Sequence, residues 1–311
     1  MKTDNPFLGV LLMLGFCAVA PMGDAVAKLL GGRVPMAELL LVRFGAQVLL
    51  LLPLVGFANL RWVRDPRVLA LTALRTLLHM LGIGMMFTAL IYLPLADAVA
   101  IAFVMPFIML LLGRWVLKEE VGPRRLIASI VGFAGTLMVV QPAFQNVGWP
   151  ALLPVGVAVN FALFMLVTRK LAKVTDAVTL QAVSGAMAVA VLAPVMVFAP
   201  VSVTGSWSDL DAGTWQLLAL LGALGTLAHL LMTWSLRHAP SATLAPMQYL
   251  EIPFATLIGW AVFGDLPNAL AAAGILVTVA AGLFILLRER AIARRLRAAP
   301  LPALVPETQA T

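Results

Sequence analysis

The sequence predicts an all-α integral membrane protein with ten transmembrane helices, arranged as two inverted repeats of five helices. Three observations lead to this fold class: ten long apolar runs, a one-sided distribution of basic residues in the loops, and a weak internal repeat. The composition agrees, because 62% of the residues are hydrophobic, 11% are charged and the mean hydropathy is +1.02. Soluble domains carry about 25% charged residues, so little of this chain is available for a soluble domain.

Each apolar run is long enough to cross a bilayer, since about 20 helical residues span a hydrocarbon core about 30 Å thick. The first run is too long for the apolar region of a signal peptide and lacks a convincing cleavage site. The single cysteine, Cys17, lies in this run and excludes an intramolecular disulfide. The expected spans are residues 8–29, 36–56, 69–91, 95–116, 124–141, 150–168, 177–199, 214–236, 242–263 and 269–287.

The basic residues of the loops predict the orientation of the chain. With a cytoplasmic N-terminus, seventeen of the 21 Lys and Arg residues fall in cytoplasmic segments, and only Lys28 and Arg33 fall outside. Arg43 and Arg75 lie within spans. This bias follows the positive-inside rule and predicts a multi-pass membrane protein with both termini cytoplasmic. The expected location is a bacterial inner (plasma) membrane. The net charge of +7 is therefore explained without a nucleic-acid partner.

The two halves of the chain resemble each other in the same order. The segment 94–120 resembles the segment 240–265, and RTLLHML at 75–81 resembles GTLAHLL at 225–231. Each half contains an odd number of spans, so the second half must lie upside down relative to the first. The loops agree, because those around 200–212 and 264–268 contain no Lys or Arg, whereas their counterparts in the first half are basic.

These repeats define the expected domains. The first five-helix repeat covers residues 1–143, the inverted second repeat covers 144–290, and residues 291–311 form a cytoplasmic tail that is basic and then disordered. The basic part of the tail is expected on the anionic cytoplasmic leaflet. Inverted repeats are typical of secondary transporters, which bind substrate near the midplane between the repeats and expose it to the two sides in turn.

The chain also resembles the drug/metabolite transporter superfamily, and within it the EamA-type carriers with ten spans. The resemblance rests on the inverted layout, on prolines at corresponding positions (Pro106 and Pro253), on the acidic turns at 118–120 and 264–265 and on the glycines that follow them. It implies a carrier for amino acids, nucleotide sugars, purine derivatives, S-adenosylmethionine or drugs. It does not identify the substrate.

Ionisable and polar residues inside spans are the candidates for substrate binding, because such groups are costly in a membrane. Glu251 is the strongest, since it lies deep and between two prolines that interrupt the helix, with Pro253 freeing the carbonyl of Tyr249. Arg43 or Arg75 can bind a carboxylate while Glu251 binds an ammonium group. The candidate substrate-binding residues are Glu251, Tyr249, Gln248, Arg43, Arg75, His79, His229 and Trp234, and the candidate kink or gating residues are Pro106, Pro253 and Pro246.

Each of these residues also has a structural interpretation. Asp24 and Lys28 are four apart and can form an ion pair, and Arg43 can be a buried partner of Glu38 or Asp24. Arg75 lies near the cytoplasmic end and can extend its guanidinium to a headgroup. In the structural interpretation, the two histidines do no more than form hydrogen bonds between helices. Asn160 and Gln181 are further neutral candidates within spans.

The expected function is that of a secondary transporter, exporting amino acids or their derivatives by alternating access. Uptake of S-adenosylmethionine or a nucleotide-like metabolite is the alternative, because a sulfonium cation also suits a buried carboxylate. The chain lacks GxxxxGK[ST], HExxH and GxSxG motifs, so ATP coupling and an intramembrane enzyme are disfavoured. The expected partners are a small-molecule substrate and the lipid bilayer, with no cofactor or metal, and ten spans suffice for a monomer.

Overall fold

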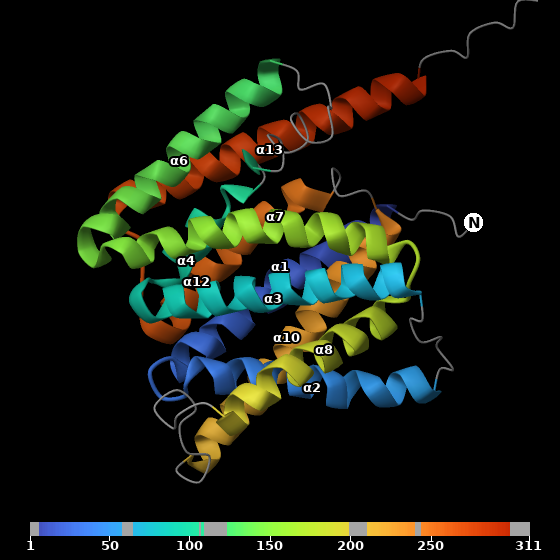
Figure 1. Cartoon of the computed structure of the whole chain (residues 1–311). Coiled ribbons are helices and arrows are strands. Elements are labelled where there is room, and N and C mark those ends of the chain that lie inside the picture. Colours follow the sequence, from blue (N-terminus) through green and yellow to red (C-terminus); the bar gives the residue numbers. More distant parts are fainter. Residues whose placement is uncertain are drawn as a thin grey trace, which may run out of the picture.

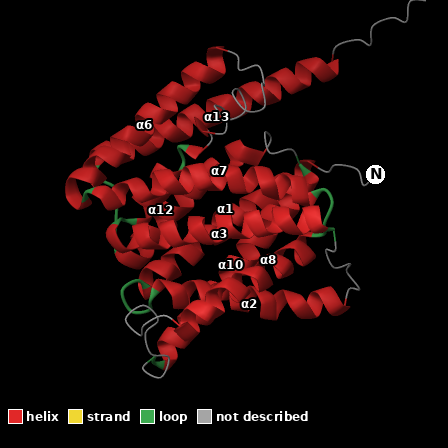
Figure 2. Cartoon of the chain, viewed as in Figure 1, coloured by secondary structure: helices red, strands yellow, loops and turns green. Residues whose placement is uncertain are grey.

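The computed structural model describes residues 6–57, 65–105, 107–108, 123–198, 210–239 and 244–298, and over these ranges the chain is helical apart from short connections (Figure 2). The helices of the first repeat are α1 (Pro6–Leu30), α2 (Met36–Phe57), α3 (Pro66–Tyr92), α4 (Leu95–Ala102) and α6 (Pro123–Val147). Those of the second are α7 (Leu153–Ala172), α8 (Ala177–Phe198), α10 (Ala212–His238), α12 (Glu251–Phe263) and α13 (Ala269–Ala298), with 3₁₀ turns η1 (Trp149–Leu152) and η3 (Ala245–Leu250).

The helices run roughly horizontally in Figure 1 and lie against one another along their length. Among the described residues, seven helices are long and apolar enough to span a membrane. The start of α1 and the ends of α7 and α13 lie at the right of Figure 1, and the last turns of α7 and α10 carry the basic residues Arg169, Lys170 and Arg237. We refer to this end of the bundle as the basic face and to the other end as the opposite face.

The predicted spans correspond to the observed helices, with two differences. Only the start of the fourth span is described: α4 ends at Ala102, a turn follows at Phe103–Val104, and Pro106 lies outside the described residues. In the ninth span the irregular backbone precedes Glu251, as the 3₁₀ turn η3, whereas α12 continues without a break through Pro253. Proline is tolerated there because it lies in the first turn, where a backbone N–H would have no acceptor within the helix.

Helices α2 and α8 correspond to each other in the two repeats. These helices have equal length, begin at Met36 and Ala177, and contain prolines at Pro53 and Pro194, so each pair is 141 positions apart. This correspondence makes Arg43 of α2 equivalent to Ser184 of α8. The sequence match of 75–81 with 225–231 relates Arg75 to Gly225 and His79 to His229, at an offset of 150. Helices α3 and α10 have equal length and begin 146 positions apart, and the difference of four residues is about one helical turn, which keeps the same helix face.

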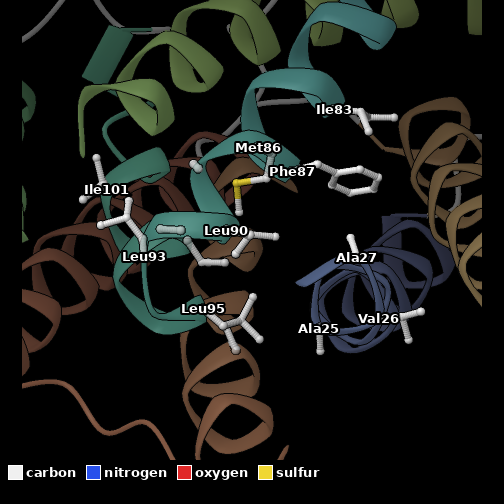
Figure 3. Packing of buried hydrophobic residues seen from close by; sticks show 14 of the residues in the cluster. Ala25, Val26, Ala27, Ile83, Met86, Phe87, Leu90, Leu93, Leu95 and Ile101 are labelled. Atoms are coloured by element: carbon white, nitrogen blue, oxygen red, sulfur yellow. The ribbon is translucent and has the colours of Figure 1, made fainter. Parts of the chain in front are cut away.

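The main hydrophobic core joins the two repeats. Figure 3 shows Phe87 and Leu90 of α3 on the side that faces Ala27 of α1, with Leu95 of the short helix α4 below them. All four belong to one cluster of buried side chains, which also includes Tyr249 and other residues of the second repeat. This packing holds the inner helices in place around the space described in the next section.

Helices α6 and α13 form a separate pair at one edge of the bundle (Figure 1), and glycines set their close approach. A Cβ added at Gly274 would lie 2.5 Å from the carbonyl oxygen of Gly135, and one added at Gly135 would lie 2.9 Å from that of Gly274. Backbone meets backbone here, so neither residue can be enlarged without moving a helix. Small residues at membrane helix interfaces serve this purpose.

We therefore expect Gly274→Val to separate α6 from α13 and to lower the free energy of unfolding by about 1–3 kcal/mol. Thermal melting of the purified protein in detergent measures the effect. Gly45→Val is the matched control, because an added Cβ at Gly45 meets no atom within 4 Å. Equal melting temperatures for the two variants would contradict the assignment of Gly274 to this interface.

The structure corrects the predicted ion pair between Asp24 and Lys28. The Lys28 ammonium instead lies 3.0 Å from the carboxylate of Asp265, just beyond α12, and donates to the carbonyl of Leu93 at 3.0 Å. Spacing within one helix permits a pair but does not exclude a better partner on another helix. Lys28 therefore ties α1 to both repeats at the opposite face, and Asp24 remains available to the interior.

Candidate functional site

An interior cavity lies between the two repeats. Its volume is about 130 Å³, and it is lined by α1, α2, α3, α4, α7, α10, η3 and α12. Most of its wall is apolar. The polar and ionisable side chains on that wall are Asp24, Arg43, His79, Asn160, His229, Gln248 and Glu251.

Three ionisable side chains of the cavity lie close enough to influence one another electrostatically. Asp24 is within range of both Arg43 and Glu251. Arg43 is the only Lys or Arg on the described cavity wall, whereas Asp24 and Glu251 are both carboxylates. Glu251 is the first residue of α12, where the chain changes from a 3₁₀ turn to an α-helix. The site thus offers one cation and two acidic groups to a ligand.

The guanidinium of Arg43 packs against the backbone of α10. A Cβ at Gly225 would lie 2.6 Å from its Cζ atom, so a larger residue there would displace the guanidinium. Arg43 is buried, and its Nη1 atom has no hydrogen-bond partner within the described part of the chain. The expected bond to Glu38 is not formed, since both oxygens of that carboxylate also lack a partner there. Arg43 therefore retains donors for an anionic group.

His79 and His229 meet at the middle of the bundle. Their Nε2 atoms are 3.2 Å apart, and the ring centroids are 4.1 Å apart. Only one of the two nitrogens can donate while the other accepts, so the pair shares a single proton across this contact. The two residues occupy corresponding positions of the inverted repeats. The contact therefore marks the pseudo-two-fold axis, where transporters of this design bind substrate.

Aromatic rings form much of the remaining wall, and no phenylalanine is among the residues predicted from the sequence. Phenylalanine is common in any apolar span, so its spacing carries no signal of a site. Phe161 and Phe164 stack at 5.6 Å, and Phe164 also contacts His79 at 4.9 Å. The five phenylalanines that line the cavity are Phe16, Phe87, Phe103, Phe161 and Phe164.

The cavity brings together five of the eight predicted substrate-binding residues: Arg43, His79, His229, Gln248 and Glu251. The other three lie outside it. Tyr249 is buried against Gly282 of α13. Trp234 packs against a small core cluster that includes Leu51 and Val55. Arg75 is fully buried between α3, α7 and α8 and does not extend to a headgroup. Contact of any of these residues with substrate stays a prediction.

The neutral candidates divide between the wall and the scaffold. Gln181 is fully buried and structural, because its amide donates to the carbonyl of His229 at 2.8 Å and to Thr233 at 3.1 Å. Asn160 lines the cavity but donates to the carbonyl of Leu78 at 2.6 Å. Of the predicted kink residues, Pro246 lies in the 3₁₀ turn and Pro253 in the first turn of α12. Within the described residues no group of three His, Cys, Asp or Glu is placed to hold a metal ion.

Comparison with known proteins identifies the family. The family described as "EamA-like transporter family" matches residues 7–141 and again residues 148–287. The chain belongs to the EamA-like transporter family. The two matched regions agree with two repeats of five helices, so the protein is a secondary transporter of small metabolites and not an enzyme. It is a multi-pass membrane protein, and its curated relatives are bacterial.

Individual members of the EamA-like family differ in what they carry. The chain is 24% identical to a riboflavin transporter of Brucella anthropi, over 91% of this chain and 99% of the relative. It is 24% identical to an S-adenosylmethionine uptake transporter of Rickettsia prowazekii, over 91% and 93%. It is 27% identical to the pseudopaline exporter CntI of Pseudomonas aeruginosa, over 88% and 94%. A solved crystal structure with 16% identity superposes with a TM-score of 0.64, over 96% of this chain and 100% of that one, which shows the shared fold.

Proposed function

We propose that this carrier exports amino acids or amino-acid derivatives that bear an aromatic or heterocyclic ring. The observation that supports this is the combination in one cavity of Arg43, the acidic pair Asp24 and Glu251, and five phenylalanine rings. Arg43 binds the carboxylate of such a substrate, a carboxylate of the site binds its ammonium group, and the rings pack on the planar part. The export direction rests on the family resemblance, and the cytoplasmic location of both termini rests on the charge bias of the loops.

Uptake of S-adenosylmethionine is the second candidate, and the same cavity favours it for a specific reason. That molecule joins an adenine ring to an amino-acid group and carries an additional positive sulfonium. The site holds two carboxylates for one arginine, so a ligand with one anionic and two cationic groups leaves no charge unpaired. A relative named as an S-adenosylmethionine uptake transporter covers most of the chain.

Uptake into proteoliposomes separates these candidates. The panel contains radiolabelled neutral, aromatic and basic amino acids, S-adenosylmethionine, riboflavin and a purine nucleoside, each with and without an imposed pH gradient. Saturable uptake and counterflow of aromatic amino acids would support the leading proposal. Movement of S-adenosylmethionine without an amino-acid signal would support the second candidate. Transport of riboflavin or the nucleoside alone would contradict a zwitterionic substrate.

Glu251→Gln tests the acidic part of the site. The amide keeps the size of the side chain but removes its charge, so we expect the apparent affinity for an ammonium-bearing substrate to fall about 10- to 100-fold. Initial rates across substrate concentration and pH measure the change. Glu38→Gln is the matched control, because Glu38 is a buried carboxylate that does not line the cavity. An unchanged affinity and pH dependence in Glu251→Gln would contradict this role.

A further inference from the structure

Arg75 is a buried cation that the cavity does not use. Its side chain is 0% exposed. It donates to the hydroxyl of Thr168 at 2.9 Å and to that of Ser184 at 2.8 Å, and its Nη2 atom has no partner within the described residues. Neither of these bonds supplies a negative charge. A buried charge that lacks a counter-ion is costly, and in a membrane protein such a group calls for a functional explanation.

The inverted repeat relates Arg75 to Arg43. In the cavity, Arg43 of α2 packs on Gly225 of α10. The corresponding residues of the other repeat are Ser184 of α8 and Arg75 of α3, and these are also in contact. Each contact thus joins one arginine and one small residue. In the contact between α2 and α10 the arginine lies on α2, whereas in the corresponding contact between α8 and α3 it lies on α3, the counterpart of α10. The protein contains two guanidinium sites related by its pseudo-symmetry.

The two arginines lie on opposite sides of the histidine pair. Arg75 precedes His79 by one turn of α3 and lies toward the basic face, whereas Arg43 lies seven residues from the start of α2, about 10 Å from the opposite face. Both arginines are within electrostatic range of His79. Phe164 separates Arg75 from the cavity, since its ring lines the cavity and lies 4.7 Å from the Arg75 guanidinium.

We propose that Arg75 is a second anion-binding site, closed in this conformation by Phe164, that binds the anionic group of the substrate when the carrier opens toward the basic face. Alternating access in an inverted repeat exchanges the environments of corresponding positions. When the cavity closes over Arg43 and Gly225, Arg75 and Ser184 line the open cavity. The substrate's carboxylate then passes from Arg43 to Arg75 across the histidine pair. The substrate's anionic group is taken from the proposed function, but the site itself is tested without any substrate.

Thiol labelling of Ser184→Cys in a Cys17→Ala background tests the proposal. Membrane-impermeant methanethiosulfonates of opposite charge, one sulfonate and one trimethylammonium, are added to vesicles from either side. We expect labelling from the basic-face side only, and about tenfold faster labelling by the sulfonate, because a nearby cation concentrates anionic reagents. Adding Arg75→Gln is expected to remove the preference for the sulfonate while labelling continues.

Two controls keep the result interpretable. Ala186→Cys lies two residues away on the exposed side of α8 and is expected to react poorly with both reagents. Thr168→Cys, on the other side of the guanidinium, repeats the measurement if Ser184→Cys melts at a lower temperature than the parent. Absence of labelling from both sides, labelling from the opposite face, or equal rates for the two reagents would overturn the proposal. The uptake panel can fail while this charge preference holds, so the two proposals fail separately.

Discussion

Arg43→Gln is expected to reduce transport about 100-fold or more while leaving the protein folded. Arg43 is the only Lys or Arg on the described cavity wall, and its Nη1 atom is buried without a partner there. A charged hydrogen bond contributes about 1.5–3 kcal/mol, and its loss also leaves the substrate carboxylate facing Asp24 and Glu251. The initial uptake rate of the panel compound with the highest wild-type rate measures the effect.

Arg43→Lys distinguishes recognition by shape from recognition by charge. The guanidinium lies flat against Gly225, where an added Cβ would approach it to 2.6 Å. A lysine ammonium keeps the charge but cannot present two parallel donors to a carboxylate. We therefore expect only partial recovery of uptake in Arg43→Lys, with melting temperatures close to that of the wild type. Wild-type uptake in Arg43→Gln would exclude Arg43 from the binding site.

Much of the fold could be predicted from the sequence, because the length and hydropathy of each apolar run determine whether that segment forms a transmembrane helix. The second expected span, 36–56, differs by one residue from α2 (Met36–Phe57), and the seventh, 177–199, by one from α8 (Ala177–Phe198). In a bilayer every backbone group of a span must be satisfied within its own helix, so an apolar run has few alternatives. The break near Glu251 was also predictable from its prolines, although not the side of Glu251 on which it lies.

The site was less accessible from the sequence, because partners come from different helices. The spacing of Asp24 and Lys28 suggested a pair, but the structure gives Lys28 to Asp265 and leaves Asp24 facing the cavity. Arg75 lies near a helix end, yet it is enclosed by Thr168 and Ser184 instead of reaching a headgroup. The partners of Lys28 and Arg75 depend on how each helix is rotated about its axis and on which helices pack beside it. A single sequence contains no signal for either.

The histidine pair shows what an internal repeat does and does not reveal. His79 and His229 stand at corresponding positions of RTLLHML and GTLAHLL, so their equivalence was visible in the sequence. Equivalence alone does not imply contact, because most corresponding residues of an inverted repeat lie far apart. Only residues near the symmetry axis meet, and the 3.2 Å contact places these two there. The two side chains therefore form one contact between the repeats on the cavity wall.

Replacing either histidine is therefore expected to have nearly the same effect. His79→Leu and His229→Leu each remove the shared Nε2 contact, and a loss of about 1–3 kcal/mol for a buried hydrogen bond corresponds to a fall in transport of about 5- to 150-fold. The double variant is expected to be little worse than either single one, because the contact can be lost only once. Uptake rates of the three variants in proteoliposomes measure this coupling.

His238→Leu is the matched control, since His238 ends α10 and does not line the cavity. Its uptake should equal that of the wild type. Additive losses in the double variant would mean that the two rings act independently, for example through their separate contacts with Phe44 and Phe16. Non-additive losses would mean that the contact between the repeats itself limits transport. This outcome fits a pair that lies on the axis about which one repeat moves against the other.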